Sequence, residues 1–166
     1  MIQNRAIRIL AIAPLTRGFG YAVMEGPENL LAAGNKGFRS NKNAKTLAWV
    51  EKFINRYQPT VLVLPKVYGK DTHRAKRIQL LHHELVVLAG KHLLKVRQFS
   101  ATQQRDQLLA DPKGTKYEMA EKLAAQFPAE LADRLPPKRK PWMSEDPRMD
   151  TFDAVGLAAV FWKPLK

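Results

Sequence analysis

Residues 9–23 read Ile9-Leu10-Ala11-Ile12-Ala13-Pro14-Leu15-Thr16-Arg17-Gly18-Phe19-Gly20-Tyr21-Ala22-Val23. An apolar run opens this stretch, and a second one follows Gly18 and Gly20, which fit a tight turn. We therefore predict two antiparallel strands that meet at this turn. The stretch Glu25-Gly26-Pro27-Glu28-Asn29 fits a second hairpin connection. The chain is thus expected to open with a meander of antiparallel strands.

The rest of the chain alternates helical and strand patterns. Alternation and β-branched content predict strands near 5–13, 19–25, 30–39, 61–65 and 94–99, and helices near 42–57, 74–92, 101–110, 115–126 and 150–162. The run Val61-Leu62-Val63-Leu64 is typical of a strand covered on both faces. This order predicts an α/β fold with a five-stranded mixed sheet, in which three antiparallel strands precede parallel strands and helices flank the sheet.

Residues 127–149 differ from their surroundings in composition. They hold five prolines and the basic residues Lys138, Arg139 and Lys140, so regular structure is not expected there. We interpret this segment as an extended basic arm within a single domain that spans 1–166.

The composition excludes several classes of protein. A chain of 166 residues fits one domain that buries about two-thirds of its surface. No apolar run approaches the roughly 20 residues of a membrane span, and no signal peptide pattern is present, so we expect a cytoplasmic protein without membrane contact. The absence of cysteine excludes disulfides, thiolate zinc sites and cysteine nucleophiles. Any metal would be bound by oxygen or imidazole.

The charge balance points to a polyanionic partner. Lys and Arg number 28 and Asp and Glu number 15, which gives a net charge of +13. Such an excess attracts polyanions whatever the fold. Nucleic acid is the expected partner, and charge alone leaves DNA and RNA open.

Several motifs follow one another in an order and spacing typical of one family. They are Ile9-Leu10-Ala11-Ile12-Ala13-Pro14-Leu15-Thr16-Arg17 with Gly20-Tyr21, Leu64-Pro65-Lys66-Val67-Tyr68, Phe99-Ser100-Ala101-Thr102 with Gly114-Thr115-Lys116, and Asp150-Thr151-Phe152-Asp153-Ala154-Val155-Gly156-Leu157-Ala158. Together they resemble the motifs of RuvC-type Holliday-junction resolvases, within the ribonuclease-H-like superfamily. The resemblance covers nearly the whole chain and implies a ribonuclease-H-like fold.

The resemblance also implies a metal site, from which this chain departs. In the family, an Asp of the first strand, a Glu of the fourth strand and two Asp residues of the closing helix hold two divalent ions, which need oxygen ligands. Here Asp150 and Asp153 remain as candidate catalytic and metal-binding residues. Ala13 and Pro65 occupy the places of the other two acids, and neither side chain can bind a metal.

Three functions follow from this departure. The first is a catalytically inactive, RuvC-like protein that binds branched or structured nucleic acid and needs no cofactor. The second is a structure-specific endonuclease dependent on Mg²⁺ or Mn²⁺ with a rearranged acid set, which recruits Asp71, Glu145 or Asp146, with His82 and His83 as further possible ligands. The third is a structural partner of ribosomal RNA or of another protein.

Two other interpretations concern the remaining acids. Asp150 could cap the closing helix, with Asp153 three positions later supporting the cap. In the absence of metal, Lys66 or Arg17 is expected to neutralise the two carboxylates as charge pairs.

The expected nucleic-acid interface combines basic residues with an aromatic residue. Tyr68 matches a phenylalanine of the family that looks like a residue that stacks on unpaired bases, a contact worth about 1–3 kcal/mol per base. The arm adds Trp142, which is either part of this surface or tucked onto the core. The basic candidates are Arg17, Lys66, Lys70, Arg74, Lys76, Arg77, Lys116, Lys138, Arg139 and Lys140.

The helix near 74–92 carries two apolar stripes. Ile78, Leu81, Leu85 and Leu88 form the stripe expected to face the core, while Leu80 and Val87 belong to a second one. RuvC-type resolvases pair through the corresponding helix, so the resemblance implies a homodimer.

Overall fold

A five-stranded sheet forms the centre of the protein. The structure is a computed structural model that describes residues 7–68, 75–111 and 113–164. The strands are β1 (Arg8–Pro14), β2 (Gly18–Glu25), β3 (Leu30–Gly37), β4 (Val61–Pro65) and β5 (Lys95–Phe99), arranged in the order β3-β2-β1-β4-β5. β1, β2 and β3 pair antiparallel, whereas β4 pairs parallel with both β1 and β5. The predicted mixed sheet is confirmed.

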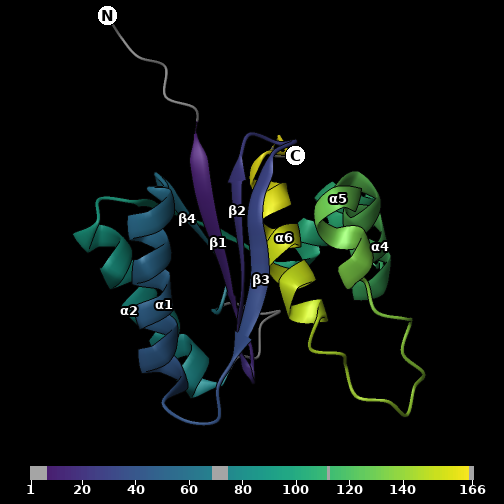
Figure 1. The fold of residues 1–166 in the computed structure, drawn as a ribbon, viewed down its shortest axis with the longest axis horizontal. Coiled ribbons are helices and arrows are strands. Elements are labelled where there is room, and N and C mark those ends of the chain that lie inside the picture. The colour runs from purple at the N-terminus through teal and green to yellow at the C-terminus, as the bar shows by residue number, and fades with distance from the viewer. Residues whose placement is uncertain (1–6, 69–74, 112, 165–166) are drawn as a thin grey trace, which may run out of the picture.

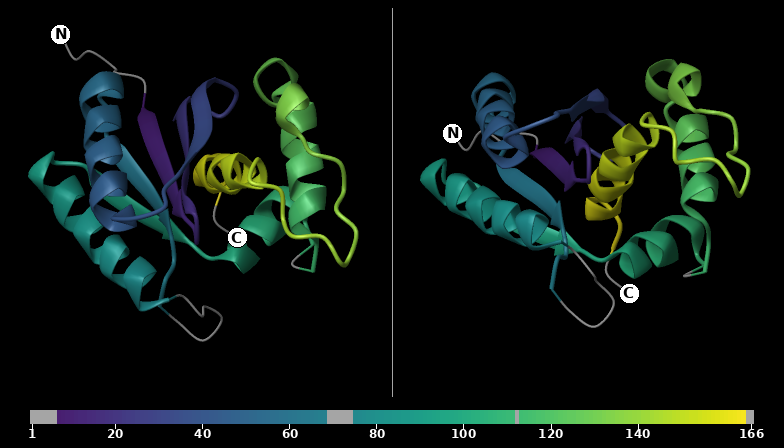
Figure 2. Two further views of the ribbon diagram at one scale, coloured as in Figure 1. Left: turned by 60° about the horizontal axis from the view of Figure 1, so that its bottom comes forward. Right: turned by 90° about the horizontal axis from the view of Figure 1, so that it is seen from below.

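Helices cover both faces of the sheet (Figure 1). α1 (Lys42–Tyr57) and α2 (Lys76–Lys91) lie on one face, and α6 (Met149–Phe161) lies on the other. α3 (Ala101–Leu109) and α4 (Lys116–Gln126) pack outside α6, as Figure 2 shows. Within the described residues, none of the helices combines the length and the apolar character that crossing a membrane requires.

β1 is buried because helices cover it on both sides. Its alternate residues belong to two separate cores: Leu10 and Ile12 pack on the side of α1 and α2, whereas Ile9, Ala11 and Ala13 pack on the side of α6. This alternation directs Ala13 toward the helix that carries Asp150 and Asp153.

Gly20 lets α6 approach the sheet closely. A Cβ atom on Gly20 would overlap the backbone carbonyl oxygen of Asp150. The first turn of α6 therefore rests directly on β2, which holds Asp150 and Asp153 beside the end of β1.

The predicted arm is partly helical. Residues 127–149 contain α5 (Pro128–Leu131) and the 3₁₀ turn η1 (Ala132–Arg134), so the prediction of no regular structure is wrong for this first part. Pro128 occupies the first turn of α5, where proline costs no hydrogen bond, and Leu131 is fully buried. From Leu135 to Arg148 the arm has no helix or strand and loops out beside α4 before it returns to α6 (Figure 1).

Candidate carboxylate site and nucleic-acid interface

Three carboxylates lie together at the first turn of α6. Asp150 and Asp153 stand three residues apart, so they share one face of the helix, and Glu145 reaches them from the end of the arm. One oxygen from each of the three lies within 4.8 Å of the others. Asp150 is 3% exposed and the Asp153 side chain 15%, so two of these charges are largely shielded from water.

Two basic side chains form ion pairs with this cluster. Arg17 Nη2 lies 3.1 Å from Asp150 Oδ1. Lys116 Nζ donates to Glu145 Oε1 at 2.8 Å and lies 3.0 Å from Asp153 Oδ2. The predicted pairing by Arg17 is thus confirmed. The pairing by Lys66 is wrong, because Lys66 is exposed and forms no ion pair among the residues that the structure describes.

Lys116 is placed by the start of α4. The Thr115 side chain caps this helix by accepting a hydrogen bond from the Glu118 backbone N–H, so Lys116 is the first helical residue. Its role as the shared partner of two acids was missed by the sequence analysis, which assigned it to nucleic-acid binding. The only feature of the sequence that could have indicated this role was the position of Lys116 directly after Gly114 and Thr115.

Burial raises the pKa values of both aspartates. Burial raises the pKa of Asp153 to about 6, and the nearby Lys116 opposes this shift only in part. Burial also raises the pKa of Asp150 against the opposing effect of Arg17. Burial alone would lower the pKa of Lys116, but Asp153 and Glu145 outweigh it and the pKa is raised. Lys116 therefore stays protonated between its two acids.

Ala13 and Pro65 line a cavity next to this cluster. They stand at the ends of the neighbouring strands β1 and β4, where carboxylates would have completed the metal site implied by the resemblance. The cavity of about 210 Å³ also contacts Asp153 and the buried side chain of Gln104. No feature of the sequence had singled out Gln104.

The donor set fits one hard cation better than two. Glu145, Asp150 and Asp153 offer the oxygen ligands that Mg²⁺ or Mn²⁺ prefers. A second ion about 3.5–4 Å away would need further carboxylates, and the adjacent positions carry Ala13 and Pro65. Two-metal chemistry is not supported by these residues.

The other acids and histidines proposed as ligands lie elsewhere. Asp146 binds Arg148 through hydrogen bonds of 2.8 and 3.0 Å, which lower its pKa to about 2. His82 is buried against the edge of the Tyr68 ring, and burial and His83 lower its pKa. Among the described residues, neither Asp146 nor the two histidines join the acid cluster. Asp71 lies outside the described residues.

The capping interpretation of Asp150 is wrong. α6 begins before Asp150, its N-cap residue is Arg148, and no side chain caps it. The Asp150 carboxylate accepts a hydrogen bond from Arg17 instead.

The basic candidates divide into structural and exposed residues. Arg77 donates to the Leu15 carbonyl at 3.0 Å and to Asn43 Oδ1 at 2.8 Å, so it ties the β1–β2 turn to α1. The candidates that remain exposed are Lys66, Lys76, Lys138, Arg139 and Lys140, together with Arg17, which is paired with Asp150. Lys70 and Arg74 lie outside the described residues.

Two aromatic side chains stand out from this surface. Tyr68 is 62% exposed just beyond the end of β4. Trp142, on the arm, is 78% exposed and lies under the Lys140 ammonium, so it is not tucked onto the core. Both rings are accessible for stacking.

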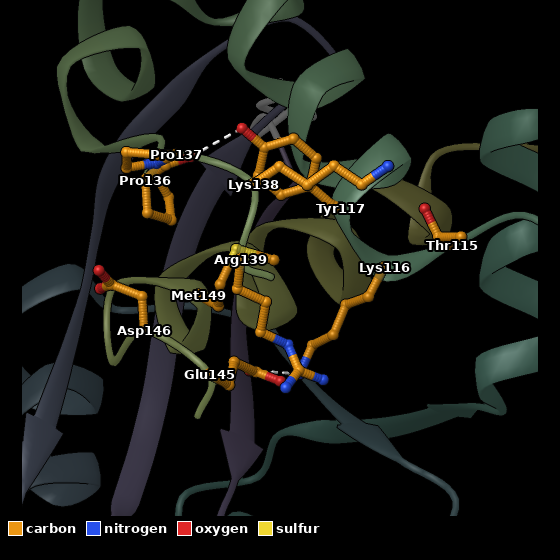
Figure 3. Close-up of a pocket in the computed structure, with 10 residues that line it drawn as sticks. All are labelled: Thr115, Lys116, Tyr117, Pro136, Pro137, Lys138, Arg139, Glu145, Asp146 and Met149. Atoms are coloured by element: carbon orange, nitrogen blue, oxygen red, sulfur yellow. Dashed lines mark hydrogen bonds and ion pairs between the residues drawn. The ribbon is translucent and has the colours of Figure 1, made fainter. Parts of the chain in front are cut away.

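A pocket of about 290 Å³ separates the arm from α4 (Figure 3). The Tyr117 hydroxyl donates to the Pro136 carbonyl at 2.7 Å and holds the arm against the helix. In Figure 3, Lys138, Arg139 and Glu145 come from the arm, and the Arg139 side chain points toward the contact between Lys116 and Glu145. The arm thus carries its positive charge to the edge of the carboxylate cluster.

Comparisons with known proteins identify the fold. No protein-family model matches this chain, and no curated protein sequence matches it. Among solved structures, Thermus thermophilus RuvC is similar with a TM-score of 0.69 at 14% identity, covering 93% of this chain and 92% of that one. The yeast mitochondrial Holliday junction resolvase Ydc2 gives 0.63 at 12% identity, with coverage of 95% and 78%. The fowlpox virus resolvase gives 0.54 at 14%, with coverage of 94% and 98%. The chain has the ribonuclease-H-like fold of these resolvases, as the resemblance implied.

Proposed function

We propose that this chain is a RuvC-like nucleic-acid-binding protein that recognises branched or structured nucleic acid without cleaving it. One observation carries the proposal: Arg17 and Lys116 form ion pairs with the three acids of the cluster, next to the strand ends where Ala13 and Pro65 stand. A two-metal nuclease of this family holds two metal cations with four acids. In this chain, the side chains of Arg17 and Lys116 pair with the acids in place of metal cations, and two of the four acid positions carry Ala13 and Pro65.

The structural neighbours support the type of ligand. Thermus thermophilus RuvC and the fowlpox virus resolvase have both been solved with Holliday junction DNA, and those complexes match this chain with TM-scores of 0.62 and 0.54. We therefore favour branched DNA over RNA as the ligand.

The chemistry of binding follows from the exposed residues. Lys66, Lys138 and Arg139 would contact phosphates, which makes affinity strongly dependent on salt. Tyr68 would stack on a base that the branch leaves unpaired. Because phosphate contacts and stacking carry little sequence information, shape would matter more than sequence.

A metal-dependent endonuclease is the second candidate. It is favoured by the approach of Glu145, Asp150 and Asp153 to within 4.8 Å of one another. These residues could hold one divalent ion if Lys116 moved away. Such an ion would supply a Lewis acid for hydrolysis of a phosphodiester.

Fluorescence anisotropy with chelator present tests the binding proposal. The ligands are a labelled four-way junction, a linear duplex of the same sequence and a structured RNA, each at two salt concentrations. We expect the tightest binding to the junction, weakened by salt. Tyr68→Ala should weaken junction binding about tenfold, the size of one lost base stack.

Leu93→Ala is the matched control, because Leu93 is 91% exposed and lies before β5, at the opposite end of the sheet from Tyr68. It should leave affinity unchanged. Equal affinity for all three ligands, insensitive to Tyr68→Ala, would contradict the proposal.

A further inference from the structure

The cavity beside the acid cluster has the lining of a site for a small flat ligand. Its walls include Ala13, Pro65, Met119 and Leu157, which are apolar. Its volume of about 210 Å³ lies below the ~300–1,000 Å³ of sites for drug-sized molecules. One nucleobase suits this size.

Gln104 gives the cavity an unused polar group. Its side chain lines the cavity, is only 9% exposed, and has no hydrogen-bond partner among the residues that the structure describes. Its amide atoms reach the open cavity and are not among the buried side-chain atoms left without a partner, so they are free to hydrogen-bond a ligand there. Its Oε1 lies near Gly156 of α6, where an added Cβ would stand 3.4 Å away from it.

Asp153 provides a second polar group in the same cavity. Its Oδ2 is buried and accepts no well-aligned hydrogen bond among the described residues, although Lys116 Nζ lies 3.0 Å away. A carboxylate oxygen accepts hydrogen bonds, whereas the Gln104 carboxamide both donates and accepts. The ligand must therefore offer a donor and an acceptor between apolar walls.

We propose that this cavity binds one unpaired nucleobase that carries an exocyclic amino group. The amino group would donate to Asp153, a ring nitrogen or carbonyl oxygen would accept from Gln104, and the apolar walls would contact the faces of the ring. The inference rests on the proposed function, since a branched nucleic acid supplies the unpaired base.

A fluorescent base placed at the branch point tests this inference. We would incorporate 2-aminopurine, which carries an exocyclic amino group and brightens when it leaves the base stack, next to the crossover of a four-way junction. A second junction would carry it within an arm. We expect the protein to raise the fluorescence at the branch point and not in the arm.

Gln104→Leu should abolish most of this rise, because it removes the amide and keeps the shape, and it should cost about tenfold in junction affinity. Gln126→Leu, the same substitution at an exposed position of α4, should match the unaltered protein. Ala13→Leu adds side-chain volume to another part of the cavity lining and should also abolish the rise, which covers the case in which Gln104→Leu fails to fold.

The inference would be overturned if binding caused no rise in fluorescence, or if the rise persisted in both variants. In either case, tight binding to the junction would still support the proposed function. A loss of junction binding in the unaltered protein, seen by anisotropy, would overturn the proposed function and the inference together.

Discussion

Lys116 is the residue on which the carboxylate cluster depends. It contacts Glu145 and Asp153 at once, while Arg17 contacts Asp150. Burying several carboxylates without cations would cost more than their hydrogen bonds return. With these two partners, the cluster is compensated by the chain itself.

Asp153→Asn tests the burial of this charge. The pKa of Asp153 is raised to about 6 from 3.8, so between these values the folded protein binds more protons than the unfolded chain. The contribution of Asp153 to stability is therefore complete below about pH 4 and is lost as the pH rises through 6. We expect Asp153→Asn to gain about 2–3 kcal/mol relative to the unaltered protein between pH 4 and pH 7.

Urea unfolding at a series of pH values measures this difference. Asp133→Asn, at an exposed position of η1, is the control and should give a difference independent of pH. A flat profile for Asp153→Asn would show that the Asp153 charge is not buried as described.

The sequence predicted the acids and one of their two partners. Arg17 follows β1 closely, so its approach to the acid site could be read from the strand order. Lys66 also follows a strand, but it is exposed beside buried Pro65 and Val67. Lys116 arrives from α4, far along the chain, and local spacing carries no information on such a tertiary contact.

The contact between β2 and α6 is the packing that positions the site. Gly20 leaves no room for a side chain under the Asp150 carbonyl. Since both aspartates lie on the first turns of α6, a shift of this helix would separate them from Arg17 and Lys116.

Gly20→Ala tests this close approach. The added methyl group overlaps the Asp150 backbone, and we expect a loss of about 2–3 kcal/mol in the free energy of unfolding, typical of an overpacked core. Gly90→Ala is the control, because a Cβ at Gly90 in α2 meets no atom within 4 Å. That variant should be more stable by about 0.5–1 kcal/mol. If Gly20→Ala and Gly90→Ala changed the free energy of unfolding equally, in thermal or urea unfolding, the close approach of α6 to β2 would be contradicted.

Helices and strands were predicted well because their patterns are local. β4, for example, has the bounds expected from its apolar run. α5 was missed because Pro128 was counted with the four other prolines of 127–149 as evidence against regular structure, whereas a proline in the first turn is compatible with a helix. The sequence also could not predict that Trp142 is exposed, since a single aromatic residue in a loop can either face solvent or pack onto the core.

At the scale of the whole molecule, α2 presents the apolar surface expected of a dimer. Leu81 and Leu85 are buried against the sheet, whereas Leu80 is 56% and Val87 46% exposed. We propose that these exposed residues pair with a second copy of the chain. Two-fold symmetry would present two equivalent surfaces to a branched ligand.

Light scattering coupled to gel filtration tests the dimer. We expect twice the single-chain mass of 18.8 kDa at micromolar concentration, and the single-chain mass after Leu80→Glu combined with Val87→Glu, because two charges would be buried in the interface. Leu93→Glu, at an exposed position outside α2, should leave the dimer intact. A single-chain mass for the unaltered protein would exclude pairing under these conditions.

The proposed absence of cleavage is tested most directly on a labelled four-way junction. The junction is incubated with the protein and Mn²⁺ or Mg²⁺ and resolved on a denaturing gel, with binding measured in parallel. The account predicts an intact junction that is nevertheless bound, because Ala13 and Pro65 supply no ligands and Arg17 and Lys116 already neutralise the acids. Metal-dependent cuts that disappear in Asp153→Ala would contradict it and establish a nuclease with a rearranged site.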